Sequence, residues 1–161
     1  MSGVRVGLGW DRHRLVPGRR LVLGGVEVPH DRGLEGHSDG DVLLHAVADA
    51  VLGAAGLGDL GGRFPPSDPK WKDADSRDLL REVVAAARAR GLVPVQADTI
   101  VVIESPRLAE HRAAIVLSLA DLLGLPPESV NLKAKTAEGL GPAGTGEAAD
   151  AHAVVVMEPL P

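Results

Sequence analysis

The segment from Ser38 to Gly53 constrains the fold of this chain most strongly. Apolar and small residues recur in it at helical spacing, and they include Val42, Leu43, Ala46, Ala50 and Leu52. Ser38 or Asp39 can cap such a helix, and Asp41 is favourable in its first turn. Only 2% of the residues are aromatic, so the core around this helix has to be built from Val, Leu, Ile and Ala.

Two further helices and several strands follow from the same reasoning. One helix begins after a cap at Asp75 or Ser76 and stops at Gly91, and another covers residues 108–123 before Gly124. Glycines and prolines make residues 56–72 a long irregular loop, and residues 139–146 a loop of small residues. The predicted strands cover residues 4–8, 98–104, 130–136 and 151–157, and a hairpin joins 20–23 to 26–29 through Gly24-Gly25.

This order of elements predicts an α+β fold. We expect a two-layer sandwich, with the helices packed on one face of a mixed, mostly antiparallel sheet. The 161 residues suit one compact domain, residues 1–161, that needs no covalent staples.

Composition excludes several classes of function. Without cysteine there are no disulfides, no thiolate zinc sites and no cysteine nucleophiles, which leaves His, Asp and Glu as the strong metal ligands. A net charge of −5, with dispersed Lys and Arg, argues against nucleic-acid binding. The N-terminal segment lacks a signal peptide's apolar region, and no stretch is apolar enough to span a membrane, so we expect a cytoplasmic protein.

A group of polar residues points to a metal site. Asp11 and His13, just after the strand 4–8, are two residues apart and lie on the same side of an extended chain. With His45 they form a ligand set that suits Zn²⁺ and leaves a fourth position open. Asp49 lies one helical turn after His45 and is either an orienting partner or a surface carboxylate. Taken singly, His45 also fits a hydrogen-bonded helix histidine and Asp11 a turn cap.

A second group follows the strand 130–136. Lys133, Lys135, Thr136 and the Gly-rich loop offer donors for a phosphate, and Glu138 could hold Mg²⁺ on phosphate oxygens. The alternative is an exposed edge strand with alternating lysines. Gly7-Leu8-Gly9 is not a dinucleotide-binding fingerprint, because the third glycine and the following helix are missing.

Five stretches, in order along nearly the whole chain, resemble the 2-C-methyl-D-erythritol 2,4-cyclodiphosphate synthase family. They are Gly9 to His13, Gly36 to Ala50, Gly58 to Gly61 with Phe64-Pro65, Asp75 to Arg77, and Asn131 to Glu138. The resemblance implies an enzyme of non-mevalonate isoprenoid synthesis that cyclises 4-diphosphocytidyl-2-C-methyl-D-erythritol 2-phosphate and releases CMP.

The resemblance also assigns roles to residues. Asp11, His13 and His45 would hold a divalent ion, usually zinc, and Glu138 would contact a second ion, Mg²⁺ or Mn²⁺, on the diphosphate. His37 and Thr136 match positions that stabilise the transition state. The remaining positions that match substrate-binding residues are Asp59 and Gly61 for the methylerythritol part, with Ser38 and the loop from Phe64 to Asp68 closing over it, and Ile103, Glu104, Ser105, Pro106, Arg107, Leu108, Ala109, Ala134 and Lys135 for cytidine.

By the same resemblance the protein is a homotrimer with active sites between subunits. One departure concerns the loop after Glu138, where Pro142 and Thr145 stand in place of an aromatic residue and an arginine, although Glu147 is retained. In the family, the aromatic residue and the arginine are associated with an anion bound on the trimer axis. Because this chain lacks both, we expect it to bind isoprenoid diphosphates weakly.

Three other interpretations fit parts of the pattern. A zinc-dependent phosphoester hydrolase would release phosphate instead of CMP. A metal- or nucleotide-binding trimeric module would bind ligands without turnover, and a domain with incidental polar residues would bind no stoichiometric metal.

Overall fold

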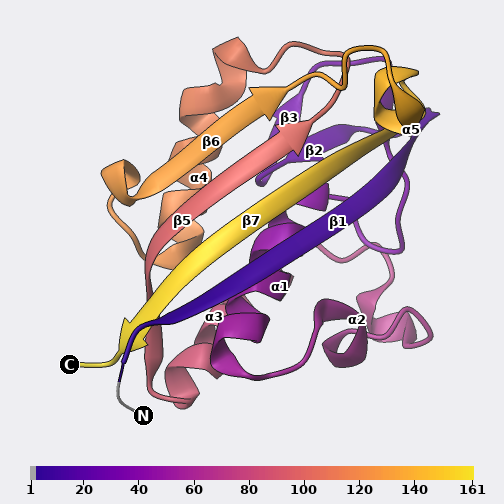
Figure 1. The fold of residues 1–161 in the computed structure, drawn as a ribbon. Helices are drawn as coiled ribbons and strands as arrows, with labels where there is room; N and C mark the ends of the chain where they lie inside the picture. Colours follow the sequence, from indigo (N-terminus) through magenta and orange to yellow (C-terminus); the bar gives the residue numbers. More distant parts are fainter. Residues whose placement is uncertain (1–2) are drawn as a thin grey trace.

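The computed structural model describes residues 3–161 as one five-stranded sheet with the main helices packed on one face (Figure 1). Neighbouring strands run antiparallel, except for one parallel pair, β5 and β6. In spatial order the strands are β4 (Arg32–Leu34), β1 (Arg5–Pro17), β7 (Ala148–Pro159), β5 (Leu92–Val102) and β6 (Val130–Lys135). The predicted hairpin is the separate pair β2 (Leu21–Leu23) and β3 (Val26–Val28). The predicted α+β sandwich is confirmed.

Three long helices form the second layer. The first, α1 (Val42–Ala55), packs on β1 and β7, and α3 (Ser76–Ala89) packs against α1 and β5. The third, α4 (Arg112–Leu123), lies behind β6. The short helices are α2 (Leu60–Arg63), α5 (Gly141–Gly144), η1 (Pro69–Trp71), η2 (Ala109–His111) and η3 (Pro127–Ser129).

The predicted N-cap of the first helix, Ser38 or Asp39, lies two or three residues before the observed one. Asp41 itself is the N-cap, and its carboxylate accepts hydrogen bonds from the backbone N–H of Leu44 and from Gly24 and Gly25 in the β2–β3 turn. Burial raises the pKa of this fully enclosed carboxyl group to about 6, against the effect of the three donors. Asp41 therefore joins the hairpin to the start of α1.

Other boundaries differ because tertiary pairing, and not the local pattern, sets them. The strand predicted at 4–8 continues to Pro17, since β7 pairs with it from Arg5 to Arg14. The strand predicted at 98–104 starts earlier and ends at Val102, and β4 was not predicted. The predicted loops 56–72 and 139–146 contain α2, η1 and α5.

The sheet and α1 approach each other closely because small residues line the contact. Ala149, Ala151 and Ala153 of β7 face α1 and are buried. A Cβ atom at Gly7 of β1 would lie 1.7 Å from the carbonyl oxygen of Ala50, and one at Gly9 would lie 1.8 Å from that of Ala46. The two glycines let the helix rest directly on the strand.

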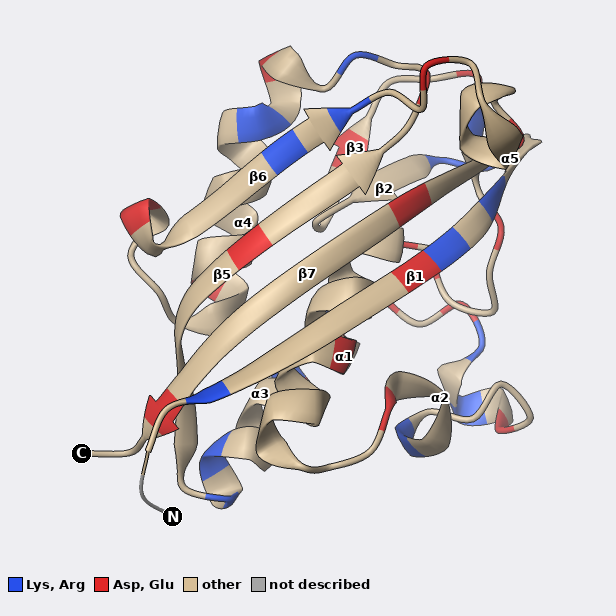
Figure 2. Cartoon of the chain, in the orientation of Figure 1, with Lys and Arg blue, Asp and Glu red and all other residues tan. Residues whose placement is uncertain are grey.

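The opposite face of the sheet is apolar and exposed. Val6, Leu8 and Trp10 of β1 are 64%, 72% and 51% exposed, and Val154 of β7 lies beside them at 38%. The middle of β7 and the adjoining part of β1 carry no charged residue (Figure 2). None of the helices in residues 3–161 has the length and apolar content that crossing a membrane requires.

Candidate metal centre and substrate cavities

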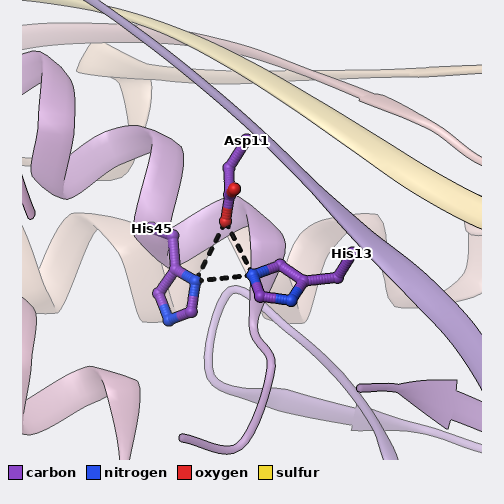
Figure 3. Close-up of side chains that lie close together, drawn as sticks. All are labelled: Asp11, His13 and His45. Carbon is purple, nitrogen blue, oxygen red and sulfur yellow. Dashed lines mark hydrogen bonds and ion pairs between the residues drawn. The ribbon is translucent and has the colours of Figure 1, made fainter. Parts of the chain in front are cut away.

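The structure brings Asp11, His13 and His45 together (Figure 3). Oδ2 of Asp11 lies 2.8 Å from Nε2 of His13 and 3.0 Å from Nδ1 of His45, and these two nitrogens are 3.0 Å apart. Asp11 and His13 lie inside β1, not after the strand as predicted, and His45 is in the first turn of α1. Their alternation continues the inward row of Gly7 and Gly9, so the close packing on α1 brings the three ligands into one group.

The electrostatics of the group favour a cation. Burial alone would raise the pKa of Asp11, but the close contacts of its carboxylate with the imidazoles of His13 and His45 outweigh this effect and hold that pKa well below its usual range. Burial likewise opposes protonation of His13, yet Asp11 raises the pKa of this imidazole. One carboxylate and two imidazoles that converge in this way form a donor set suited to Zn²⁺ or a similar ion, and three protein ligands leave a position open.

Glu138 does not belong to this group. It lies after β6 with a φ of 54°, and its Oε1 accepts a hydrogen bond from the hydroxyl of Thr136 at 3.3 Å. The three-ligand group is therefore formed by β1 and α1 alone.

A cavity of about 130 Å³ adjoins the metal ligands. Of the residues predicted to bind substrate, His37, Ser38, Gly61 and Phe64 line it, together with His13. Pro66, from the loop predicted to close over the substrate, lines it as well, and the lining residues that sequence reasoning did not single out are Leu60, Trp71 and Leu79. Among these, Trp71 carried a signal, because a tryptophan in a loop rich in Gly and Pro needs a packing partner.

Asp59 and Asp68 were predicted at this cavity but are not among its lining residues. Each carboxylate caps a short helix, Asp59 by accepting from Gly62 N–H at 2.7 Å and Asp68 from Lys70 N–H at 2.9 Å. Their observed contacts shape the segment that covers the cavity.

The segment 56–72 is folded onto α1. Asp49 accepts a hydrogen bond from Leu60 N–H at 2.7 Å, so it anchors the start of α2. Phe64 packs edge-on against Trp71, with ring centroids 4.7 Å apart. Asp49 was expected either to orient His45 or to be a surface carboxylate. Among the described contacts it has no hydrogen bond to His45, and its carboxylate is engaged by Leu60 N–H.

A second cavity, of about 530 Å³, lies where the parallel strands β5 and β6 end. Nine predicted residues line it, namely Ile103, Glu104, Pro106, Arg107, Leu108, Ala109, Ala134, Lys135 and Thr136. Ser105 is not among the lining residues, and it precedes Pro106 through a cis peptide bond. Arg112 was not predicted, and its guanidinium donates to the carbonyl of Leu132 at 2.9 Å.

Glu104 connects the two loops at this second cavity. Its Oε2 accepts a hydrogen bond from Ala137 N–H at 3.1 Å. Glu104 follows β5 and Ala137 follows β6, so this contact fixes the loop that carries Thr136 and Glu138.

The two cavities are separate on one chain. They share no lining residue, and β1, which carries two of the metal ligands, is three strand positions away from β6, about 14 Å at the usual spacing. Figure 1 likewise places β6 at one edge of the sheet and α2 beyond the other.

The chain is similar to known proteins over nearly its whole length. A family model described as the YgbB family matches residues 4–158. The 2-C-methyl-D-erythritol 2,4-cyclodiphosphate synthase of Gloeobacter violaceus is 56% identical over 155 residues, which cover 96% of this chain and 95% of that protein. The chain belongs to the 2-C-methyl-D-erythritol 2,4-cyclodiphosphate synthase family. Its resemblance in sequence is thereby confirmed.

Solved structures agree with this membership. A 2C-methyl-D-erythritol-2,4-cyclodiphosphate synthase described as the form with CDP bound superposes with a TM-score of 0.89 at 42% identity, covering 96% of this chain and all of that one. The bifunctional IspDF of Campylobacter jejuni superposes with a TM-score of 0.95 at 37% identity. This chain is covered to 99% and spans 43% of the length of that longer protein.

Proposed function

We propose that this chain, as a single domain over residues 1–161, is a lyase of isoprenoid precursor synthesis. It converts 4-diphosphocytidyl-2-C-methyl-D-erythritol 2-phosphate into 2-C-methyl-D-erythritol 2,4-cyclodiphosphate and CMP. The observation that carries this proposal is the cluster of Asp11, His13 and His45 beside a cavity, in a chain that matches synthases of this name over 96% of its length. The hydrolase alternative is not favoured.

The reaction needs positioning and charge neutralisation more than covalent chemistry. An oxygen of the 2-phosphate attacks the β-phosphorus of the diphosphate, the bond from that phosphorus to the oxygen of CMP breaks, and CMP leaves with the electron pair. Two anionic groups must approach each other in this step. A protein nucleophile is not required, which fits a chain without cysteine.

In this proposal Asp11, His13 and His45 would hold Zn²⁺, and Glu138 would bind Mg²⁺ or Mn²⁺ that accompanies the diphosphate. When bound, these ions polarise phosphate oxygens and offset their negative charge. His37, in the smaller cavity, and Thr136, in the larger one, donate hydrogen bonds to the oxygens where charge develops, and for this the hydroxyl of Thr136 turns from Glu138 to the substrate. The segment 56–72 restricts water at the smaller cavity, which favours cyclisation over hydrolysis.

The two cavities divide the substrate between them. The smaller one takes the methylerythritol part through Ser38, Gly61 and Phe64, and Asp59 and Asp68 act from the segment that covers it. The larger one takes the cytidine nucleotide, with Arg107 and Lys135 available to its phosphates. The CDP-bound state described for a relative at 42% identity supports a cytidine ligand.

A homotrimer with active sites between subunits would bring the two halves together. On one chain the cavities share no lining residue, which supports a complete site formed by one cavity from each of two copies. The exposed apolar face of Val6, Leu8, Trp10 and Val154 offers the surface for this contact. Light scattering on the purified protein tests the trimer, and Leu8→Glu should dissociate it.

Phosphorus NMR tests the activity directly. The zinc-loaded protein is incubated with the substrate and Mg²⁺, beside His45→Ala and a matched control, His30→Ala, whose histidine lines neither cavity. Stoichiometric CMP and a cyclic diphosphate, lost in His45→Ala alone, would establish the synthase. Release of inorganic phosphate would establish a hydrolase instead, and ligand binding without turnover would reduce the protein to a binding module.

A further inference from the structure

We propose that Asp39 and Ser76 are positioning residues that set the tautomer of His45, so that its Nδ1 presents a lone pair to the metal. The inference rests on the proposed function, because it concerns the same metal site. It adds a connection between the start of α3 and the ligand group that sequence reasoning did not find.

Ser76 is the nearest partner of the far side of the His45 ring. It is the first residue of α3 and 1% exposed, and its Oγ lies 2.9 Å from Nε2 of His45. Its hydroxyl donates to Oδ1 of Asp39 at 2.5 Å. Since a serine hydroxyl has one hydrogen, the atom that faces His45 is an oxygen lone pair, and Nε2 of His45 must be the donor.

Asp39 is itself held in place as an acceptor. Its Oδ2 accepts from Ser76 N–H at 3.0 Å, and its Oδ1 accepts from Asp41 N–H at 3.1 Å. An ionised carboxylate accepts and cannot donate, so the direction of the whole chain of hydrogen bonds is set from Asp39 outwards. His45 donates to Ser76, and Ser76 donates to Asp39.

The proton on Nε2 leaves Nδ1 of His45 unprotonated, and this nitrogen faces Asp11 and His13. Without the chain of hydrogen bonds, the carboxylate of Asp11 at 3.0 Å would draw the proton to Nδ1, where it blocks a metal. Ser38 Oγ lies 3.1 Å from Nε2, but its hydroxyl is not committed to a carboxylate, so it can donate as well as accept.

His13 shows the same arrangement with the opposite nitrogen. Its Nδ1 lies 2.5 Å from the carbonyl oxygen of Glu35, an acceptor that no substitution removes, and its Nε2 faces the group. His45 therefore presents Nδ1 and His13 presents Nε2 to the metal site, and the other ring nitrogen of each histidine faces an oxygen acceptor. Only the acceptor of His45 is a side chain, which makes it open to mutation.

Zinc affinity is the first test. Competition with a chromophoric chelator at pH 8 compares the wild type with Ser76→Ala, Asp39→Asn and Thr99→Val. Thr99 is the matched control, because it is fully buried and its hydroxyl also donates a hydrogen bond, to the carbonyl of Asn131. This contact joins β5 to β6, and β7 separates both strands from β1 and its metal ligands. Loss of such a partner typically weakens metal binding 10–100-fold. We expect about that loss for Ser76→Ala, a loss in the same direction for Asp39→Asn, and a change under about twofold for Thr99→Val.

The tautomer itself is the second test, and a merely structural role would not move it. Nitrogen NMR of histidine-labelled, metal-free protein reports which nitrogen of His45 carries the proton. We expect the Nε2–H form in the wild type and a shift toward Nδ1–H in Ser76→Ala and Asp39→Asn.

Unchanged zinc affinity or an unchanged tautomer in a folded Ser76→Ala protein would overturn the proposal. Should Ser76→Ala fail to fold, Asp39→Asn decides by the same two measurements. A wild type that binds no Zn²⁺ would refute the metal site of the proposed function, whereas the NMR measurement on metal-free protein would still decide the role of Ser76.

Discussion

Replacing Gly9 with alanine should separate β1 from α1 and dismantle the metal group. The added Cβ would lie 1.8 Å from the carbonyl oxygen of Ala46, whereas real Cβ atoms keep at least 3.0 Å, so the strand must move by about 1.2 Å. The position of a Cβ atom is fixed by its own backbone and the atom it meets is a backbone oxygen, so no side-chain rotation relieves the clash. We expect a loss at the upper end of the range for overpacked cores, about 3 kcal/mol of unfolding free energy.

The same displacement should abolish tight zinc binding. Metal ligands tolerate errors of about 0.2 Å, and Asp11 and His13 follow Gly9 on the displaced strand while His45 stays on the helix. Gly53→Ala is the control, since its Cβ meets nothing within 4 Å and alanine should stabilise α1 by about 0.5–1 kcal/mol. Urea denaturation and zinc titration measure both effects. A Gly9→Ala protein with wild-type stability and zinc affinity would refute the packing argument.

Three further predictions concern other contacts. The pKa of Asp41 is raised from 3.8 to about 6 in the folded state, so its protonated form stabilises the fold. This contribution, on the order of 3 kcal/mol, is full below about pH 4 and is lost as the pH rises through 6. Urea denaturation should therefore show that Asp41→Asn lowers the free energy of unfolding more at pH 4 than at pH 7. Asp49→Ala removes the acceptor of Leu60 N–H, so proteolysis within 56–72 should accelerate while the thermal midpoint falls little. Zinc at 1,000 times its Kd should stabilise the wild type by about 4 kcal/mol and Asp11→Asn far less, as thermal denaturation with and without a chelator would show.

The sequence predicted the elements whose local pattern agrees with their surroundings. The helix α3, the end of α4 at Gly124 and the β2–β3 hairpin carry their own caps and turn glycines, so local chemistry suffices to place them. The helix predicted over 108–123 begins only at Arg112, because residues 109–111 form η2 and no side chain caps the start of α4. The full length of β1 could not be predicted, because its second half is largely polar and is extended through pairing with β7 up to Arg14 and with β4 from Leu15 to Pro17. For the same reason the start of α1 was misplaced, since the hairpin that engages Asp41 is distant in sequence.

The candidate site divides in the same way. Asp11, His13 and His45 were found by spacing, because strand and helix periodicity place them on the faces that meet. Ser76 carried only a capping signal, and its contact with His45 depends on how α3 packs beside α1. Asp39 was predicted to cap the first helix, whereas its carboxylate holds the first residue of α3. Such contacts between the ends of two helices leave no periodic trace in a sequence.

The position of β7 also determines when this protein can fold during synthesis. β7 lies between β1 and β5 in the sheet, although it follows every other element along the chain. Until the ribosome has made residues 148–159, the strand that carries Asp11 and His13 has β4 as its partner over only three residues. The nascent chain therefore exposes two unpaired strand edges and the apolar face of α1, and chaperones that bind such segments should protect it until translation has passed β7.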